Sequence, residues 1–535
     1  MSTTTPLRPA ERQRRVAARI DRPELTERVG EILNRRPAVG LAVGLVRDGR
    51  LEGFEGRGVA DVTSKASITE ETVFRIGSIT KTFTAVAVMQ LWEQGLLDLD
   101  APANDYLRAY RLVPANAASR PATARHLLTH TAGIPEVIHI ADLLHPGWGS
   151  FGSRPAIHSV KVGDPLPPLA EYYRGGLRSV VEPGTAFAYS GHGFATLGQI
   201  VEDVSGAPLD GYLREHIFEP LGMTDTDLIR TGRVESRLAT GYDLGPSGAR
   251  PVIDREWVGL GGGGIYSSCR DMARYVAALV GGGANEHGSI LGPKTLATMF
   301  EAHYRPDPRL PGMGLAFFRS ESGGHRLVGH DGILPGFTSS LLVAPDDGLG
   351  LIAFTNGSPG AMAWMPIELE RLLRHLLDVP DETIRTDVPH HPEIWSEICG
   401  RYRLPERIAD LRGRVAMGAG LEVFVGGGRL MARILTPVPA LYRGVPLHPD
   451  DEADPYLFRV DLSPLGMPTV RLAFDHEAGV GTTAVHTDLQ SLSLYKVGAT
   501  KGPGLWAVGA LGAVAVATAV TAARRRPKDS RGVSS

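Results

Sequence analysis

The stretch Phe74–Gln94, FRIGSITKTFTAVAVMQLWEQ, constrains the fold of this chain most, because after its first residues it is apolar on nearly every face. A helix that is hydrophobic all round is usually buried inside a large domain. The pattern therefore predicts a central, buried helix, and Gly95 stands where a glycine commonly ends one.

Ser78 and Lys81 stand three residues apart in this stretch, so on a helix they project from the same side, one turn apart. A serine hydroxyl becomes a good nucleophile when a base takes its proton. A lysine amine can do so if it is neutral, and burial favours this because lost hydration disfavours the ammonium form. The motif alone also fits a helix-start serine followed by a surface lysine.

A second S-x-x-K, Ser493 to Lys496, shows why the spacing is not sufficient. It lies in SLSLYKV, which alternates like a strand. An odd separation on a strand puts two side chains on opposite faces, so no proton could pass between them.

Composition describes a globular protein with ample core, since 43% of the 535 residues are hydrophobic and 21% are charged. The length suggests about three domains. A net charge of −3 gives no indication of nucleic-acid binding. Cys269 and Cys399 lie in what we expect to be different domains and lack the spacing of a disulfide framework or a metal site. We therefore expect both cysteines to be small buried hydrophobic residues.

The hydrophobic patterns indicate an α/β domain followed by a small all-β barrel. Apolar runs at Val39–Val46 and Leu51–Val62, split by Asp48-Gly49, predict a hairpin. Two further strands around Asp347-Gly348 predict that both ends of the domain share one sheet, with helices between them. Short alternating segments such as LEVFV and YLFRVDL predict the barrel. The expected segments are a basic disordered leader (1–22), the α/β domain (23–378), a linker (379–394), the barrel (395–497), a transmembrane helix (502–523) and a basic tail (524–535).

The two ends of the chain bear on its location. Residues 502–523 carry no charge, and a helix of that length would be about 30 Å long, enough for a bilayer core. The alternative is an Ala/Gly-rich tail too weakly hydrophobic to insert. Arg524–Arg526 would stay in the cytoplasm, which places the catalytic domain on the outer face of the cell membrane. Residues 1–22 lack the apolar core of a signal peptide, however, so the cytoplasmic face stays open.

Six segments occur in the order typical of one family: FRIGSITKTFTA, RHLLTHTAGIP, PGTAFAYSGHGF, FEPLGMTDT, GGGGIYSS and GHDGILPGF. Together they resemble the serine β-lactamase and penicillin-binding-protein superfamily, in particular its class C-like esterase and D-aminopeptidase branch. The resemblance covers roughly residues 23–377. It implies an α/β sandwich with an antiparallel sheet, an all-helical lobe and an active site between them. The barrel is similar to the lipocalin-like domain appended to some members.

The resemblance also implies a role for each matching residue. Ser78 would be the acylated nucleophile and Lys81 its proton partner. Tyr189 would serve as a general base that later returns the proton, and His330 would donate a hydrogen bond near the substrate. The remaining positions are the backbone N–H groups of Ser78 and Ile333 in the oxyanion hole and, at the substrate-binding surface, Gly191 and Gly332.

Two departures from the family pattern bear on the substrate. The usual Y-x-N motif is Tyr189-Ser190-Gly191 here, and His330 stands where many members have lysine. The missing asparagine amide would grip the amide side chain of a β-lactam antibiotic. We therefore expect an acyl-enzyme hydrolase for esters or D-amino-acid-type amides, attached to the membrane.

Two alternatives remain open: a β-lactamase or D,D-carboxypeptidase in the narrow sense, and a catalytically silent, membrane-anchored binding protein. We expect no cofactor and no metal. His126 and His130 are four residues apart, but Leu127 stands where a zinc hydrolase needs its glutamate. The sequence does not set the oligomeric state.

Overall fold

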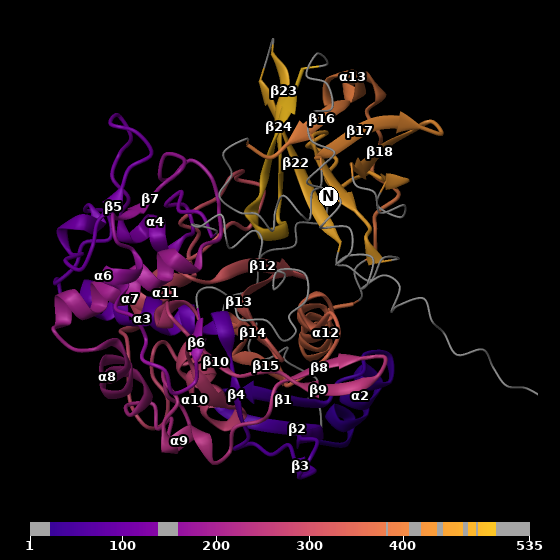
Figure 1. Ribbon diagram of the computed structural model, residues 1–535. Helices are drawn as coiled ribbons and strands as arrows, with labels where there is room; N and C mark the ends of the chain where they lie inside the picture. The colour runs from indigo at the N-terminus through magenta and orange to yellow at the C-terminus, as the bar shows by residue number, and fades with distance from the viewer. Residues whose placement is uncertain are drawn as a thin grey trace, which may run out of the picture.

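The computed structural model describes residues 22–136, 159–380, 383–405, 419–435, 442–463, 469–477 and 480–498. Figure 1 shows a sheet with flanking helices, a helical lobe beside it and a β-barrel above both. The predicted leader lies outside the described residues, apart from residue 22.

A seven-stranded antiparallel sheet organises the lower part of the molecule. In spatial order its strands are β12 (Phe318–Ser322), β13 (His325–Leu334), β14 (Phe337–Ala344), β15 (Leu349–Thr355), β1 (Gly40–Arg47), β2 (Arg50–Asp61) and β3 (Ala66–Ser67). β1 pairs with both β2 and β15, so strands from the two ends of the unit lie side by side. The predicted hairpin and the predicted shared sheet are both confirmed.

Helices cover both faces of this sheet. α2 (Arg22–Arg35) and α12 (Ala361–Leu376) pack on one face with Leu41, Val43 and Leu45 of β1. α10 (Cys269–Val280) packs on the other face with Ala42 and Val46. Every residue of β1 is therefore buried, as expected for a strand covered on both sides.

α10 packs very closely on β1. A Cβ atom at Gly44 would lie 2.5 Å from the Cys269 Sγ, so only glycine allows this approach. The Ser268 side chain caps α10 by accepting the N–H of Asp271. Cys269 is fully buried, as predicted, whereas Cys399 is only partly buried, so the prediction holds for one of the two cysteines.

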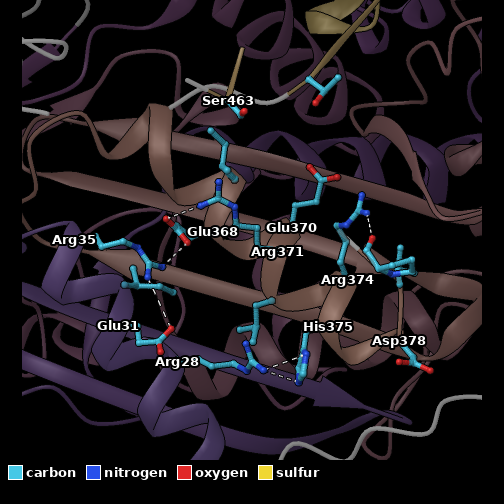
Figure 2. A pocket seen from close by; sticks show the side chains of 16 residues that line it. Arg28, Glu31, Arg35, Glu368, Glu370, Arg371, Arg374, His375, Asp378 and Ser463 are labelled. Atoms are coloured by element: carbon cyan, nitrogen blue, oxygen red, sulfur yellow. Dashed lines mark hydrogen bonds and ion pairs between the residues drawn. The ribbon is translucent and has the colours of Figure 1, made fainter. Parts of the chain in front are cut away.

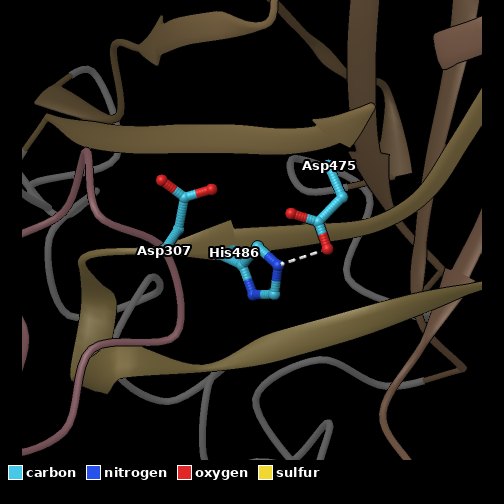
Figure 3. A group of neighbouring side chains, drawn as sticks. All are labelled: Asp307, Asp475 and His486. Atoms are coloured by element: carbon cyan, nitrogen blue, oxygen red, sulfur yellow. Dashed lines mark ion pairs between the residues drawn. The ribbon is translucent and has the colours of Figure 1, made fainter. Parts of the chain in front are cut away.

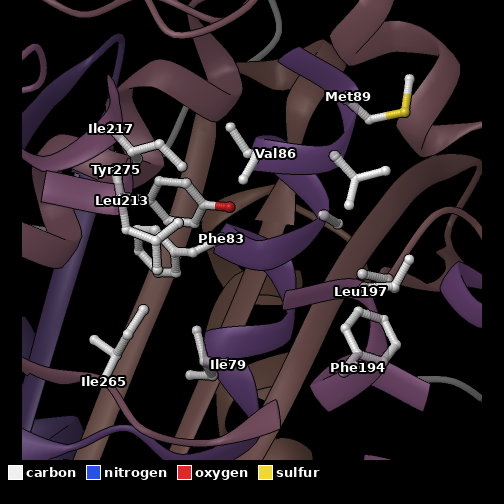
Figure 4. Packing of buried hydrophobic residues seen from close by; sticks show 14 of the residues in the cluster. Ile79, Phe83, Val86, Met89, Phe194, Leu197, Leu213, Ile217, Ile265 and Tyr275 are labelled. Carbon is white, nitrogen blue, oxygen red and sulfur yellow. The ribbon is translucent and has the colours of Figure 1, made fainter. Parts of the chain in front are cut away.

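The central helix is α3 (Thr80–Glu93), and its residues Thr80–Leu91 are all buried. Figure 4 shows Phe83 among side chains from several surrounding elements. The Phe83 ring stacks on Tyr275 of α10 at 3.9 Å between centroids and meets Phe218 edge-on at 5.8 Å. The predicted central helix is confirmed, although it starts later than expected. Ser78 lies in a 3₁₀ turn, η2 (Gly77–Ile79), that leads directly into it.

The helical lobe surrounds α3 with α4 (Ala124–Leu128), α7 (Gly191–Ser205), α8 (Leu209–Leu213) and α11 (Pro293–Phe300). Shorter elements of this unit are β4 (Val73–Arg75), β5 (Leu112–Val113), β6 (Ser159–Lys161), α6 (Leu169–Tyr172), β7 (Leu177–Arg178), α9 (Gly232–Glu235), β8 (Tyr242–Gly245), β9 (Gly248–Pro251), β10 (Arg255–Trp257), η6 (Leu260–Gly262) and β11 (Tyr266–Ser268).

The C-terminal strands form a nine-stranded antiparallel sheet that is nearly closed into a barrel, as predicted. After the short helix α13 (Trp395–Ile398), its strands are β16 (Gly400–Arg403), β17 (Leu421–Gly426), β18 (Arg429–Ile434), β19 (Val445–Pro446), β20 (His448–Pro449), β21 (Leu457–Val460), β22 (Val470–Glu477), β23 (Gly481–Thr487) and β24 (Ser493–Val497). The two edge strands, β19 and β20, are adjacent in sequence, so the sheet curls back on itself. Its interior holds a separate apolar core that includes Tyr402, Phe458 and Phe474.

Arg309 joins the barrel to the hydrolase unit. Its guanidinium forms an ion pair with Asp307 at 2.7 Å and a second one with Asp454 of the barrel at 3.0 Å. It also donates to the backbone carbonyl of Phe474 in β22 at 2.9 Å. One side chain thus bridges the two parts of the chain.

The prediction of a single-pass membrane protein is wrong. Among the residues that the structure describes, no helix combines the length and the apolar character that crossing a bilayer requires. Residues 502–523, on which the prediction rested, lie outside the described residues, as does the predicted basic tail. The lack of charge in this stretch is necessary for insertion into a bilayer but does not by itself show that a helix crosses one. The predicted membrane partner, membrane location and outer-face placement depended on this helix and are corrected with it.

Candidate active site

Ser78 and Lys81 face each other at the start of the central helix. The Lys81 Nζ lies 3.0 Å from the Ser78 Oγ and donates to the Gly262 carbonyl at 2.6 Å. The Lys81 side chain is 2% exposed. Because the turn η2 and α3 are continuous, the three-residue spacing brings a hydroxyl and an amine within hydrogen-bond distance in a water-poor environment.

Tyr189 lies close to this amine. The Lys81 Nζ is 4.9 Å from the centroid of the Tyr189 ring. The ring stacks on His130 at 4.1 Å, and His130 Nδ1 accepts the N–H of Ser190 at 3.1 Å. Two contacts from His130 therefore position the segment that carries Tyr189. The HTAGIP signature, which begins with His130, thus has a positioning role.

The backbone of β13 lies against the turn that carries Ser78. A Cβ atom at Gly77 would be 2.8 Å from the Ile333 nitrogen, so the two predicted oxyanion donors belong to segments in contact. A Cβ atom at Gly332 would be 2.0 Å from the Ile76 carbonyl oxygen and 2.3 Å from the Ser339 Oγ. The expected reason for a glycine at position 332 was a close approach of the backbone to substrate. The structure indicates another reason: without a side chain at 332, β13 can pack against the turn that carries Ser78.

His330 is buried in β13, 3% exposed, close to two aromatic rings. Its ring centroid is 5.3 Å from that of Phe318 and 6.1 Å from that of Tyr189, while its Nδ1 lies 2.7 Å from the Asp331 carbonyl oxygen. Burial raises the pKa of the adjacent Asp331 to about 6, even though the Ser340 hydroxyl donates to its carboxylate at 2.5 Å. Contacts thus link the predicted site residues in series, from Ser78 to Lys81, from Lys81 to the Tyr189 ring, and from Tyr189 to His330.

Gly191 begins α7, and a carboxylate stands beside it. The Gly191 N–H donates to the Glu136 Oε2 at 2.5 Å. A Cβ atom at Gly191 would lie 3.3 Å from the Glu136 Oε1. Glu136 thus occupies the direction in which a side chain at 191 would point. The sequence contained one indirect signal of this, the missing asparagine of the Y-x-N motif, but no pattern that indicated Glu136.

The barrel also reaches the site. Leu492, which precedes β24, is buried in one apolar cluster with Phe187, Tyr189 and Met313, and Leu404 packs against the same cluster. The sequence interpretation found no nucleophile–base pair in the barrel and missed this contribution, because an isolated leucine carries no signal of its partner.

The histidines of the site are not arranged as metal ligands. His126 Nδ1 lies 3.2 Å from the Thr123 nitrogen in a capping box, whereas His130 stacks on Tyr189. Burial lowers the pKa of His126, which favours the neutral ring. Elsewhere in the described residues, one group has ligand-like spacing: Asp307, Asp475 and His486, whose ligand atoms lie within 4.8 Å of one another (Figure 3). Both oxygens of Asp307 already accept from Arg309, so this group is better explained as part of the contact between barrel and hydrolase unit.

A groove of about 760 Å³ lies between α2 and α12, with Ser463 and Thr469 of the barrel at its rim. Its lining is densely charged, as Figure 2 shows. Arg35 pairs with Glu368 at 3.2 Å, and the Arg28 guanidinium lies 2.8 Å from His375 Nε2. These charged side chains pair with one another, and none of the predicted site residues lines the groove.

The fold and the site geometry agree with a comparison against known families. The family model described as Beta-lactamase matches residues 25–373. The chain belongs to the beta-lactamase family. The prediction of a serine hydrolase of this superfamily is thereby confirmed at the level of the family.

Individual relatives of this beta-lactamase family chain are distant. A D-aminopeptidase from Brucella anthropi is 29% identical over 326 residues, which cover 60% of this chain and 57% of that protein. Protein flp from Staphylococcus aureus is 24% identical over 322 residues, 59% of each. The chain therefore spans less than two thirds of the length of these curated relatives. An octameric penicillin-binding protein homologue from Pyrococcus abyssi is 25% identical, with a TM-score of 0.56 over 89% of this chain and 100% of that one.

Proposed function

We propose that this protein is a serine hydrolase that forms an acyl-enzyme on Ser78 and cleaves esters or amides of D-amino-acid type. The observation that carries the proposal is the 3.0 Å contact between the Ser78 Oγ and a Lys81 amine that is almost completely buried. Membership of the beta-lactamase family and the D-aminopeptidase among the relatives support the same reaction class.

In the proposed first half-reaction, Lys81 accepts the Ser78 proton as the Oγ attacks the substrate carbonyl carbon. The negative charge on the carbonyl oxygen is stabilised by the backbone N–H groups of Ser78 and Ile333. Collapse of this intermediate breaks the bond to the leaving group, which takes a proton from Lys81 or Tyr189. The product is an ester of Ser78, and the alcohol or amine departs.

In the second half-reaction, a water molecule attacks the same carbonyl after giving its proton to the Tyr189–Lys81 pair. Ser78 leaves and recovers that proton, so acid product and free enzyme are restored. His330, buried beside Tyr189, would hold the substrate by a hydrogen bond. Gly191 offers no amide to a β-lactam side chain. The kcat/KM for esters is therefore expected to exceed that for the β-lactam nitrocefin.

Covalent labelling by a fluorophosphonate, read as an increase in intact mass, tests the proposal directly. The wild-type protein should take up one label, and Ser78→Ala should take up none. Turnover of p-nitrophenyl acetate should fall about 10⁴-fold or more in Ser78→Ala, because losing a nucleophile removes the whole covalent route. Hydrolysis at the parental rate by this variant would refute the assignment.

A further inference from the structure

Arg75 is a buried charge three residues before the proposed nucleophile. It is the last residue of β4, and its side chain is only 4% exposed. Its Nη1 donates to the Asp254 Oδ1 at 2.6 Å and to the Arg255 carbonyl. The guanidinium carbon also lies 4.9 Å from the centroid of the Tyr266 ring. Because removing a guanidinium from water is costly, these contacts are needed to keep the charge where it lies.

A glycine-rich segment, residues 259–264, passes beside the turn that carries the nucleophile. The Ile76 N–H donates to the Ile265 carbonyl, just after this segment, at 3.1 Å. A Cβ atom at Gly263 would lie 3.9 Å from the carbonyl carbon of Gly77. A shift of the segment would therefore be felt at the turn and at the side chains that it presents.

The same segment holds the amine of the site. The Gly262 carbonyl accepts from the Lys81 Nζ at 2.6 Å, and the Gly261 carbonyl accepts from the Thr84 hydroxyl at 2.8 Å. The bond to Gly262 sets the direction of one N–H of Lys81. It thereby also sets how the neutral amine presents its lone pair to the Ser78 Oγ, 3.0 Å away. The position of one backbone carbonyl thus affects how well the amine can take the serine proton.

Arg75 holds the beginning of the chain that leads to this carbonyl. The Arg255 carbonyl, which accepts from Arg75, opens β10, and η6 follows shortly after and ends at Gly262. Asp254 is held from a second side, because its Oδ2 accepts from the Arg230 Nη1 at 3.0 Å. The Arg75 guanidinium therefore connects the strand before the nucleophile to the start of the segment whose end orients the amine.

We propose that Arg75 is a positioning residue for acylation: it holds the segment from Asp254 to Gly262 where the Gly262 carbonyl orients the Lys81 amine. This inference rests on the proposed acyl-enzyme function. In this role Arg75 takes no part in bond making or in holding the ester. Its loss should therefore lower the acylation rate constant and leave the dissociation constant of the ester nearly unchanged.

Arg75→Met and Arg75→Lys test this role with p-nitrophenyl acetate. Methionine has no donor, so the acylation rate constant should fall about 10- to 100-fold, while the dissociation constant of the ester changes less than about 3-fold. Both hydrogen bonds of Arg75 come from one nitrogen, so a lysine Nζ can replace them in part. Arg75→Lys should accordingly acylate about 3-fold or more faster than Arg75→Met. Stopped-flow release of p-nitrophenol over a range of ester concentrations gives both constants.

The matched control is Arg270→Met. Arg270 also pairs with a buried carboxylate, that of Asp225 at 2.6 Å, but it lies in α10, outside residues 254–262. This variant should keep the wild-type acylation rate constant. Asp254→Ala cuts the contact with Arg75 from the side chain that is 28% exposed, and it should show the same selective loss. It decides the test if Arg75→Met does not fold.

Fluorophosphonate labelling counts the competent sites and so separates rate from folding. A purely structural Arg75 would lower the number of labelled chains and leave the rate constant per labelled chain unchanged, which would overturn the inference. Wild-type rate constants in both Arg75→Met and Asp254→Ala would also overturn it, as would an equal loss in Arg270→Met or an Arg75→Lys no faster than Arg75→Met. Absence of labelling and of ester turnover in the wild type would overturn the proposed function instead.

Discussion

Leu492 of the C-terminal barrel and Tyr189 of the hydrolase unit are buried in the same apolar cluster, 4% and 8% exposed. They are about 300 residues apart in sequence. The barrel is therefore part of the packing that holds the proposed general base, in addition to its attachment through Arg309.

This relationship predicts that Leu492→Ala lowers activity without removing any catalytic group. A buried leucine truncated to alanine costs about 2–5 kcal/mol of packing. If about a third of that free energy is lost from transition-state stabilisation because Tyr189 is displaced, kcat/KM for p-nitrophenyl acetate falls about 3- to 20-fold. Steady-state kinetics measure this loss, while fluorophosphonate labelling should still reach one label per chain.

The control for Leu492→Ala is Leu430→Ala, because Leu430 is fully buried in the core of the barrel itself. It should lower the melting temperature of the barrel and leave kcat/KM nearly unchanged. Equal losses of activity in both variants would mean that the barrel matters only through its overall stability.

Lys81→Met should abolish the covalent step while preserving the fold. Methionine keeps much of the length and apolar stem of lysine but has no amine to accept the Ser78 proton. We expect kcat to fall about 10³-fold or more, because the nucleophile and its base act as one unit. Stopped-flow measurement of p-nitrophenol release gives the acylation rate, and circular dichroism checks the fold.

The second S-x-x-K motif supplies the control for this variant. In β24, Ser493 contacts His486 Nδ1 at 2.8 Å, whereas Lys496 donates to the Glu397 carbonyl. The prediction that these two side chains do not act together is confirmed by their separate partners. Lys496→Met should acylate at the wild-type rate, and a loss comparable to that of Lys81→Met would contradict the assignment of the first motif.

Gly332→Ala should disable the site through the backbone. The new Cβ would meet the Ile76 carbonyl at 2.0 Å and the Ser339 hydroxyl at 2.3 Å, so β13 must move away from the turn that carries Ser78. Displacing the proposed Ile333 N–H from the oxyanion hole should cost about 10²- to 10³-fold in kcat. Gly211→Ala in α8 is the control: a Cβ there meets nothing within 4 Å, so activity should persist with a slight gain in stability.

Local sequence patterns predicted those parts of the molecule that depend on neighbouring residues. The apolar run after Ser78 identified the central helix, and Asp48-Gly49 identified the hairpin between β1 and β2. Both signals are periodicities or turn residues, which are set by local geometry. The family resemblance added the order of the motifs and the positions of Tyr189 and His330, which no periodicity indicates.

The contacts that refine the site could not be predicted in this way. Glu136 reaches Gly191 across 55 residues, and Leu492 reaches the Tyr189 cluster from another unit. Neither residue belongs to a repeating sequence pattern. The contact that each one makes is set by the tertiary fold, which no local pattern indicates. The transmembrane prediction rested on residues 502–523 alone, and no helix of the described residues is long and apolar enough to cross a bilayer.

Asp271 provides a prediction about pH and stability. It is fully buried at the start of α10, where its carboxylate accepts the N–H of Asp225 at 2.5 Å and the Thr226 hydroxyl at 2.9 Å. Burial raises its pKa to about 6, and these hydrogen bonds only partly offset that effect. α10 also carries Tyr275, which stacks on Phe83 of the central helix, so the stability of α10 affects the scaffold of the site.

The direction in which stability changes with pH follows from which state, folded or unfolded, binds the proton. Between pH 4 and pH 6 the folded protein keeps a proton on Asp271, whereas the unfolded chain, with a carboxyl pKa of about 3.9, has lost it. The contribution of Asp271 to stability is therefore fully present below about pH 4 and is lost as the pH rises through 6. The loss is at most about 3 kcal/mol, since one pKa unit corresponds to about 1.4 kcal/mol. Asp271→Asn cannot titrate at this position. As the pH rises from 4 to 7, the free energy of unfolding of the variant should therefore increase relative to that of the wild type, as measured by urea denaturation. Parallel curves for the two proteins would show that Asp271 does not hold its proton in the folded state.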